Sequence, residues 1–369
     1  MTVTGGTDYG LATGLQSQNG AGTGGSASKP AGIASAGQPT LQVTCNGQTV
    51  AANSSTCFIS AQPAFPQLVA SLVPAAGQAL SGNVQWTLVA VYDSPEYPVK
   101  DPNTGVVTWY YWEYTYTTGP ITLPATSSWT VANYVAQLYG GAAKLSYTGS
   151  YSGSISFNIL GNPNPFVSTV QSALAAYPWR PSLPWYLFQL VNQESSYKQF
   201  NTGTVNRYLP NWGTPQGFGL MQVDLLFWPD SYQVLIWDWT QNVTLGSGIL
   251  QGDITSANNF WLTQQNSFNA YNSLAAQHGA QPAPPPWDVT EGGPPGGGCL
   301  FSYNLGEAGA HPFSDAIAMK YYNAGAGSPY LQFVGPSSPT SYDAHWAYSQ
   351  TGGNLTDYPE LVCSKTQGN

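Results

Sequence analysis

The chain has 369 residues, enough for two domains, yet only 7% of them are charged, against roughly 25% in an average soluble protein. The net charge is −9, and the eight Lys and Arg residues form no basic cluster. This composition excludes a nucleic-acid footprint and disfavours adhesion to an anionic membrane. We also expect no membrane span, because no stretch reaches roughly 18 apolar residues.

The N-terminal segment, residues 1–40, is rich in Gly, Ala, Ser and Thr and poor in large apolar residues. Such a composition buries too little surface to fold alone, so a flexible arm is predicted. Its first residues, MTVTGGTDYG, lack the basic and apolar regions of a signal peptide. Three alternatives remain: a signal that has been removed, another export route, or release of the protein by lysis or injection.

Residues 41–163 have the pattern of a β domain. Segments 84–92 and 106–117 are rich in β-branched and aromatic residues, and the turn signal DPNTG at 101–105 separates them. Shorter strands are expected at 145–147 and 154–160. Many short strands with Gly and Pro turns predict an immunoglobulin-like β-sandwich, an accessory domain. The stretch 128–138 fits either a strand region or a short helix.

The four cysteines are Cys45, Cys57, Cys299 and Cys363. An even count in a chain with so few charges favours disulfides and an oxidising compartment, extracellular or periplasmic. The spacing of Cys45 and Cys57 suits a local disulfide, which leaves Cys299 and Cys363 to fasten the C-terminal segment; four buried thiols are the alternative. No CxxC pair occurs and the histidines do not cluster with the cysteines, so no metal site is expected.

After a Gly/Pro boundary at 161–165, the hydrophobic period becomes helical and predicts a mainly α domain over 164–369. A first helix is expected from Val167 to Tyr177 and a second from Pro184, with Ser182 as its cap. One face of the second helix carries Leu187, Leu190, Val191 and Glu194.

Glu194 is an isolated acid in an aromatic, weakly charged segment. No Asp or Glu lies between Glu113 and Glu194, and the next acid is Asp224. Desolvation on an apolar helix face raises the pKa of a carboxyl group and keeps a proton available near neutral pH. Glu194 is therefore predicted to be a general acid.

Further helices are expected along the rest of the domain. One contains Asn242 and Gly246, and a separate one begins at Thr255 or Ser256 and ends at Gly279. A Pro/Gly-rich insertion at 280–298 is predicted to be loop. A last helix is expected from Pro312 to Tyr322.

Four short motifs follow one another in this domain. They are Glu194-Ser195, Gly219-Leu220-Met221-Gln222, Asn242 with Gly246, and Tyr322-Asn323-Ala324-Gly325. In this order the motifs resemble those of lytic transglycosylases with the goose-type-lysozyme-like catalytic domain, over residues 166–335. Tyr321 replaces the Ala that the family carries before its Tyr-Asn pair. The segments before Gly219 and before Tyr322 are long for the family, which puts cleft shape and substrate length in doubt.

The resemblance implies that Glu194 cleaves the MurNAc–GlcNAc β-1,4 bond of peptidoglycan strands without hydrolysis, leaving a 1,6-anhydromuramoyl end. No metal or cofactor is required. The family's substrate-binding roles fall on Ser195, Met221, Gln222, Tyr322 and Asn323. Ser195 would lie beside the acid, the Met221 backbone would contact an N-acetyl group and Gln222 would bind sugar. Tyr322 would hydrogen-bond Glu194, and Asn323 would orient the substrate.

Two other functions remain open from the residues. A goose-type-lysozyme-like hydrolase would use an acid such as Asp224, Asp230 or Asp238 to hold a water molecule. A catalytically silent protein would keep the fold as part of an extracellular or tail-like assembly, and the low charge favours such self-assembly or a larger secreted complex. Because few groups titrate between pH 2 and 7, we also expect stability to vary weakly with pH.

Overall fold

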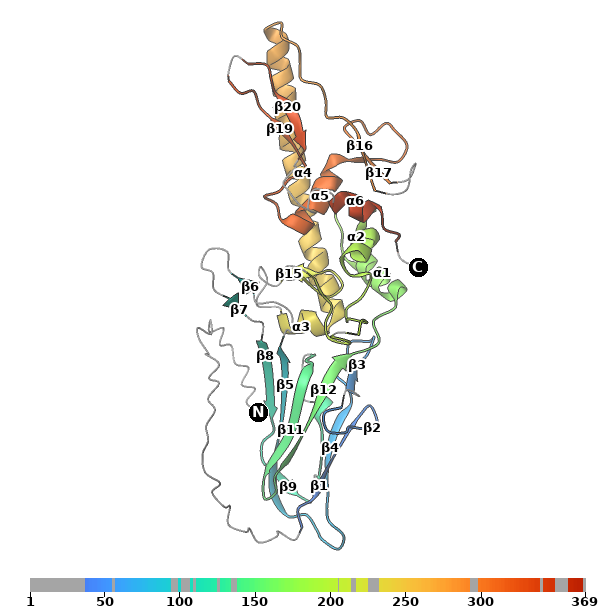
Figure 1. The fold of residues 1–369 in the computed structure, drawn as a ribbon, viewed down its shortest axis with the longest axis vertical. Helices are drawn as coiled ribbons and strands as arrows, with labels where there is room; N and C mark the ends of the chain where they lie inside the picture. Colours follow the sequence, from blue (N-terminus) through green and yellow to red (C-terminus); the bar gives the residue numbers. More distant parts are fainter. Residues whose placement is uncertain are drawn as a thin grey trace. The chain divides into compact units, whose positions relative to one another are not determined.

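The computed structural model describes residues 37–54, 57–93, 99–100, 107–108, 111–124, 127–133, 138–204, 206–213, 217–224, 232–292, 298–338, 341–348 and 358–367. The predicted arm lies outside these ranges up to residue 36, and so does the predicted turn at 101–105. The fold is mixed α+β (Figure 1). It divides into two compact units. The sheet unit holds the described residues of 37–58, 65–93 and 111–159. The helical unit holds those of 59–64, 99–108 and 160–367.

The sheet unit contains two antiparallel sheets. One has the strand order β10-β4-β1-β2, and the other has β3-β12-β11-β5-β8 with β9 paired to β5. Their strands are β1 Thr40–Cys45, β2 Gln48–Thr49, β3 Cys57–Ile59, β4 Leu68–Val73, β5 Gly82–Asp93, β8 Tyr111–Thr117, β9 Ile121–Leu123, β10 Ser128–Thr130, β11 Gly141–Gly149 and β12 Gly153–Gly161. The antiparallel pair of β6 Val99–Lys100 and β7 Val107–Thr108 belongs to the helical unit.

Alternating side chains of the two sheets form the core of this unit. Along β5, Val84, Trp86, Leu88 and Ala90 are buried. Trp86 stacks on Trp129 of the other sheet at 6.1 Å between ring centroids. The stretch 128–138, for which the sequence allowed a strand or a helix, begins with strand β10 and continues as the short 3₁₀ helix η1 Val131–Asn133.

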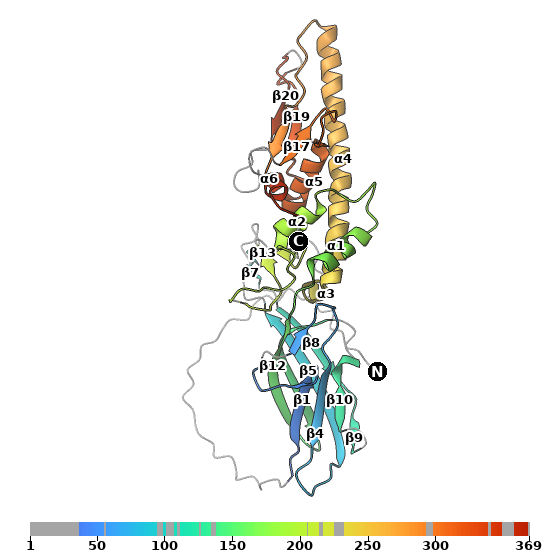
Figure 2. The same cartoon turned by 90° about the vertical axis from the view of Figure 1, so that its right-hand side faces the viewer.

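The helical unit is built around one long helix, α4 Trp239–Gln277. Helices α1 Val167–Ala176 and α5 Phe313–Ala324 pack along it, and α2 Leu187–Ser195 lies beside α6 Tyr358–Cys363 (Figures 1 and 2). Short elements complete the unit: β13 Trp212–Gly213, β14 Gly217–Phe218, β15 Val223–Asp224, α3 Tyr232–Trp237, β16 Val289–Glu291, β17 Cys299–Ser302, β18 Ala310–Pro312, β19 Leu331–Val334 and β20 His345–Tyr348.

The prediction of two helices between Asn242 and Gly279 was wrong, because α4 runs unbroken. The hydroxyl of Thr255 donates to the carbonyl of Gln251 inside the helix, at 2.9 Å, instead of capping a new one. Ser and Thr make either bond, so sequence alone does not choose between them. The insertion at 280–298 is also not all loop, since it contains β16.

The start of α2 differs from the prediction as well. Its N-cap residue is Tyr186, which makes no side-chain cap bond, so Ser182 is not the cap. Within the described ranges, no helix is both long enough and apolar enough to cross a membrane.

Candidate active site

Glu194 projects from the last turn of α2. The apolar face predicted for this helix is buried, with Leu187, Leu190 and Val191 all at 0% exposure. The helix ends at Ser196, whose backbone is left-handed at φ 53°. Ser195 is buried and its hydroxyl donates to the Val191 carbonyl at 3.3 Å. The end of this helix therefore fixes the position of the acid.

Glu194 as a whole residue has intermediate exposure, while its carboxyl group is surrounded by protein and desolvated. Desolvation by burial raises its pKa to about 7, and a hydrogen bond donated by the Tyr358 hydroxyl to Oε1 acts in the opposite direction. Close to neutral pH the group is divided between acid and carboxylate, which suits a residue that must give and then take a proton. The raised pKa agrees with the expectation from the isolated position of Glu194.

The Gly219–Gln222 segment forms a tight turn between β14 and β15. Gly219 has φ +74°, and a Cβ there would lie 2.6 Å from both Asn242 Nδ2 and Gln199 Oε1. Two buried amides hold this turn. Gln199 Oε1 accepts from the Leu220 N–H at 3.1 Å, and its Nε2 donates to the carbonyls of Leu235 and Ile236.

Asn242 provides the second support of the turn. From the first part of α4, its Oδ1 accepts from the Met221 N–H and its Nδ2 donates to the Phe218 carbonyl, both at 2.8 Å. Gly246 lies one helical turn later on the same face. A Cβ at Gly246 would lie 2.3 Å from Met221 Cβ, so glycine leaves room for the buried methionine. The Asn-x-x-x-Gly spacing thus has a packing reason in this chain.

Tyr322 reaches the same turn from α5. Its hydroxyl donates to the Met221 carbonyl at 2.5 Å. The proton of the Tyr322 hydroxyl therefore goes to the Met221 carbonyl, and it is Tyr358 that donates a hydrogen bond to Glu194. Tyr322 is nevertheless electrostatically coupled to the acid: burial, then the negative charges of Glu194 and Asp253, raise the pKa of its hydroxyl. Three of the four motifs therefore meet at Met221, and Tyr322 couples them electrostatically to Glu194 of the fourth.

The two remaining motif residues differ in their surroundings. Gln222 has a left-handed backbone at φ 45°, and its Nε2 donates to the Gly219 carbonyl at 2.8 Å. A Cβ at Gly213 would lie 2.1 Å from Gln222 Oε1, so the amide is packed against the neighbouring strand. Asn323 is exposed.

Two further carboxyl groups in the helical unit have raised pKa values. Burial raises the pKa of Asp253, on α4, to about 7. Burial raises the pKa of Asp315, on α5, to about 6, while a 2.8 Å hydrogen bond from Trp185 Nε1 opposes that effect. The charge of Asp253 acts on Tyr322 and that of Asp315 on Tyr186. The helical unit therefore contains desolvated carboxyl groups in addition to that of Glu194.

The acids considered from sequence for a water-holding role have other positions. Asp238 is the N-cap of α4, where Oδ1 accepts from the Thr240 N–H at 2.9 Å. Asp224 lies in β15, and Asp230 lies outside the described residues. Sequence reasoning missed Asp253, Gln199 and Tyr358. Gln199 lies between the exposed Lys198 and the buried Phe200, and the local sequence pattern marks neither Gln199 nor Tyr358 as part of the site.

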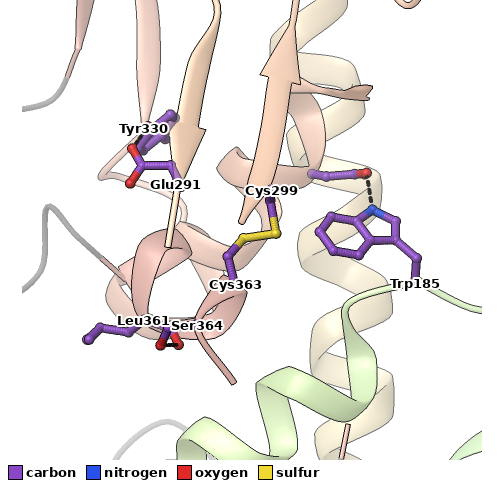
Figure 3. Close-up of a disulfide and its surroundings, with 8 residues drawn as sticks. Trp185, Glu291, Cys299, Tyr330, Leu361, Cys363 and Ser364 are labelled. Carbon is purple, nitrogen blue, oxygen red and sulfur yellow. Dashed lines mark hydrogen bonds between the residues drawn. A yellow bond between two sulfur atoms is a disulfide. The ribbon is translucent and has the colours of Figure 1, made fainter. Parts of the chain in front are cut away.

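The C-terminal segment reaches the site through α6. Cys363, at the end of α6, is bonded to Cys299 of β17 (Figure 3), and in the sheet unit Cys45 is bonded to Cys57. These are the pairs that the spacing suggested. Among the described residues, no group of three or more His, Cys, Asp and Glu side chains is arranged to hold a metal ion. Comparisons with protein-family models, curated proteins and solved structures found no match for this chain.

Proposed function

We propose that the chain is a peptidoglycan-cleaving lytic transglycosylase with Glu194 as its acid and base. The observation that carries this proposal is the environment of Glu194: a carboxyl group with a pKa of about 7, bonded to Tyr358 and coupled to Tyr322, which in turn binds the Met221 backbone. The motif resemblance names the reaction. On this proposal the helical unit is lysozyme-like and the sheet unit is an immunoglobulin-like accessory domain.

The chemistry needs one carboxyl group. Protonated Glu194 gives its proton to the glycosidic oxygen, and the bond from that oxygen to the anomeric carbon of MurNAc breaks. The Glu194 carboxylate then takes the proton of the 6-hydroxyl group, whose oxygen bonds to the anomeric carbon. The products are a free GlcNAc hydroxyl and a 1,6-anhydro end, and Glu194 is protonated again. A pKa near the working pH favours both proton transfers.

The location proposed for this activity is extracellular or periplasmic. Peptidoglycan lies outside the cytoplasmic membrane, and the two disulfides are typical of proteins in an oxidising compartment. The partners are then glycan strands, with no cofactor.

The test is digestion of purified sacculi, followed by mass spectrometry of the released muropeptides. Wild-type protein is expected to release 1,6-anhydro products. Glu194→Gln is expected to lower the rate at least about 100-fold, the usual contribution of a general acid. Glu307→Gln is the matched control, because Glu307 is exposed, and should retain the rate. Intact sacculi with folded wild-type protein would favour the catalytically silent assembly protein instead.

A goose-type-lysozyme-like hydrolase is the second candidate, and Asp253 is the observation that favours it. Asp253 is a second desolvated carboxyl group that is coupled to Tyr322. As a carboxylate it would accept a proton from a water molecule that attacks the anomeric carbon. The products would then be reducing ends with no anhydro sugar, and Asp253→Asn would abolish their formation.

A further inference from the structure

Helix α6 connects Glu194 to a disulfide. Its first residue, Tyr358, donates its hydroxyl hydrogen bond to Glu194 Oε1. Its last residue, Cys363, is bonded to Cys299. The helix between them has six residues and spans about 9 Å. One end therefore contacts the acid, while the other is covalently attached to β17 (Figure 3).

A helix of six residues does not form by itself in water, so α6 depends on its attachments. The disulfide joins it to a strand 64 residues earlier in the chain. After the helix, the carbonyl of Thr366 accepts from Asn192 Nδ2 at 2.9 Å, and the carbonyl of Gln367 accepts from the Tyr197 hydroxyl at 2.7 Å. These bonds attach the segment that follows α6 to Asn192 of α2 and to Tyr197 just after that helix.

Gly292, just after β16, shows how closely α6 is fitted. Its φ is +71°, and a Cβ there would lie 2.4 Å from the Glu360 carbonyl oxygen and 2.8 Å from Cys363 Cβ. The backbone at Gly292 therefore lies in direct contact with α6, with no room for a side chain between them. Tyr358 itself is only 3% exposed. Its ring excludes water from the side of Glu194 that faces α6.

The titratable groups around Glu194 come from each neighbouring element. Tyr358 on α6 and Tyr322 on α5 are coupled to Glu194 itself. Tyr186, the N-cap of α2, acts on Tyr358, and Asp253 on α4 acts on Tyr322. Lys320 is buried on α5 two residues before Tyr322, so it projects from a different face of that helix. Burial outweighs the Tyr358 hydrogen bond in setting the state of Glu194.

We propose that Tyr358 is a positioning residue for Glu194 and that the Cys299–Cys363 disulfide holds it there, so that residues 358–367 keep the acid dry and in place. This proposal rests on the proposed function, in which Glu194 is the acid and base. Its geometry is independent of the substrate.

The two roles of Tyr358 have opposite effects on Glu194. Tyr358→Phe keeps the ring but removes a hydrogen bond that favours the carboxylate, so the pKa of Glu194 should rise above about 7. Tyr358→Ala opens the acid to water, so its pKa should fall toward the ordinary 4.5. A residue that only stabilised the fold would not give shifts of opposite sign.

The experiment is a pH titration of the full chain labelled with ¹³C at glutamate carboxyl groups, followed by NMR. The Glu194→Gln spectrum assigns the signal of Glu194. In the double variant Cys299→Ser with Cys363→Ser, the pKa of Glu194 is expected to fall by about one unit or more. The matched control is Cys45→Ser with Cys57→Ser, which removes the disulfide of the sheet unit and should leave that pKa unchanged.

An unchanged Glu194 pKa in a folded Cys299/Cys363 double variant would overturn the proposal. If that variant does not fold, as judged by circular dichroism, Tyr358→Ala decides, and an unchanged pKa there overturns the proposal equally. The titration uses no glycan. A failed sacculus digestion with the expected pKa shifts would therefore reject the transglycosylase and keep the positioning role.

Discussion

The sheet unit and the helical unit are stabilised in different ways. Apolar and aromatic side chains that alternate along strands form the core of the sheet unit, as around Trp86. Among the described residues, buried polar side chains gather in the helical unit, and Thr118 is the one such residue in the sheet unit. Buried polar groups cost free energy unless they are bonded, and Gln199 and Asn242 use both ends of their amides on the backbone near Met221.

The disulfide of the sheet unit also differs from that of the helical unit. Cys45 and Cys57 close a separation of 12 residues, whereas Cys299 and Cys363 close one of 64. The first links two strands of the sheet unit, and the second ends in α6, the helix that contacts Glu194. The sheet unit is therefore stabilised mainly by the burial of apolar side chains. In the helical unit, specific polar contacts position the side chains of the candidate site. Stability and site geometry should therefore respond to different substitutions.

The largest effect on stability is expected in the sheet unit. Trp86→Ala removes a fully buried side chain and should lower the free energy of unfolding by about 3 to 5 kcal/mol. Trp287→Ala is the matched control, because that indole is 63% exposed, and it should cost less than about 1 kcal/mol. Guanidinium unfolding followed by circular dichroism measures both. Equal losses would contradict the account of the sheet-unit core.

A smaller loss of stability with a larger loss of activity is expected in the helical unit. Asn242→Ala leaves the Met221 N–H and the Phe218 carbonyl without their partner, at a cost of about 2 to 3 kcal/mol. The turn that binds Tyr322 should loosen, so on the proposed function sacculus cleavage should fall more than stability predicts. Asn258→Ala makes the same change at an exposed position of α4 and should alter neither quantity. If the Asn242→Ala variant cleaves sacculi at the wild-type rate, the turn does not contribute to the active site.

The effect that is smallest for each step of the experiment is a pH dependence of stability, which belongs to the helical unit. The pKa of Glu194 is raised by burial from 4.5 to about 7, so between these values the folded state binds more protons than the unfolded state. Stability contributed by this group is complete below about pH 4.5 and is lost as pH rises toward 7, by at most about 1.4 kcal/mol for each pH unit. Asp253 and Asp315 act with the same sign, and His311, whose pKa is lowered by burial, acts with the opposite sign.

Thermal unfolding between pH 4 and 8 measures this effect. Glu194→Gln is expected to flatten the decline above pH 4.5, while Glu307→Gln, at an exposed position, should follow the wild type. The few carboxyl groups predicted a weak pH dependence from sequence. Their desolvation instead predicts a protein that is more stable in mild acid than at neutral pH, and identical slopes for the two variants would reject that account.

The sequence by itself determined the features that depend on neighbours along the chain. The alternation in residues 84–92 appears as β5, the helical period of 167–177 appears as α1, and the face shared by Leu187 and Glu194 is present on α2. These patterns are local because side-chain direction repeats every two residues in a strand and every 3.6 in a helix. The spacing of apolar residues was therefore sufficient to place an acid at the end of an apolar helix face.

The tertiary structure alone decided which groups surround that acid. Tyr358 lies 164 residues after Glu194, and only the packing of α6 on α2 brings its hydroxyl to the carboxyl group. The same holds for Asp253, which becomes a desolvated acid through the burial that helix packing gives it. The exchange of Tyr322 for Tyr358 as the partner of Glu194 has the same cause. Hydrogen-bond partners and desolvation depend on distances through space, and a one-dimensional pattern does not contain them.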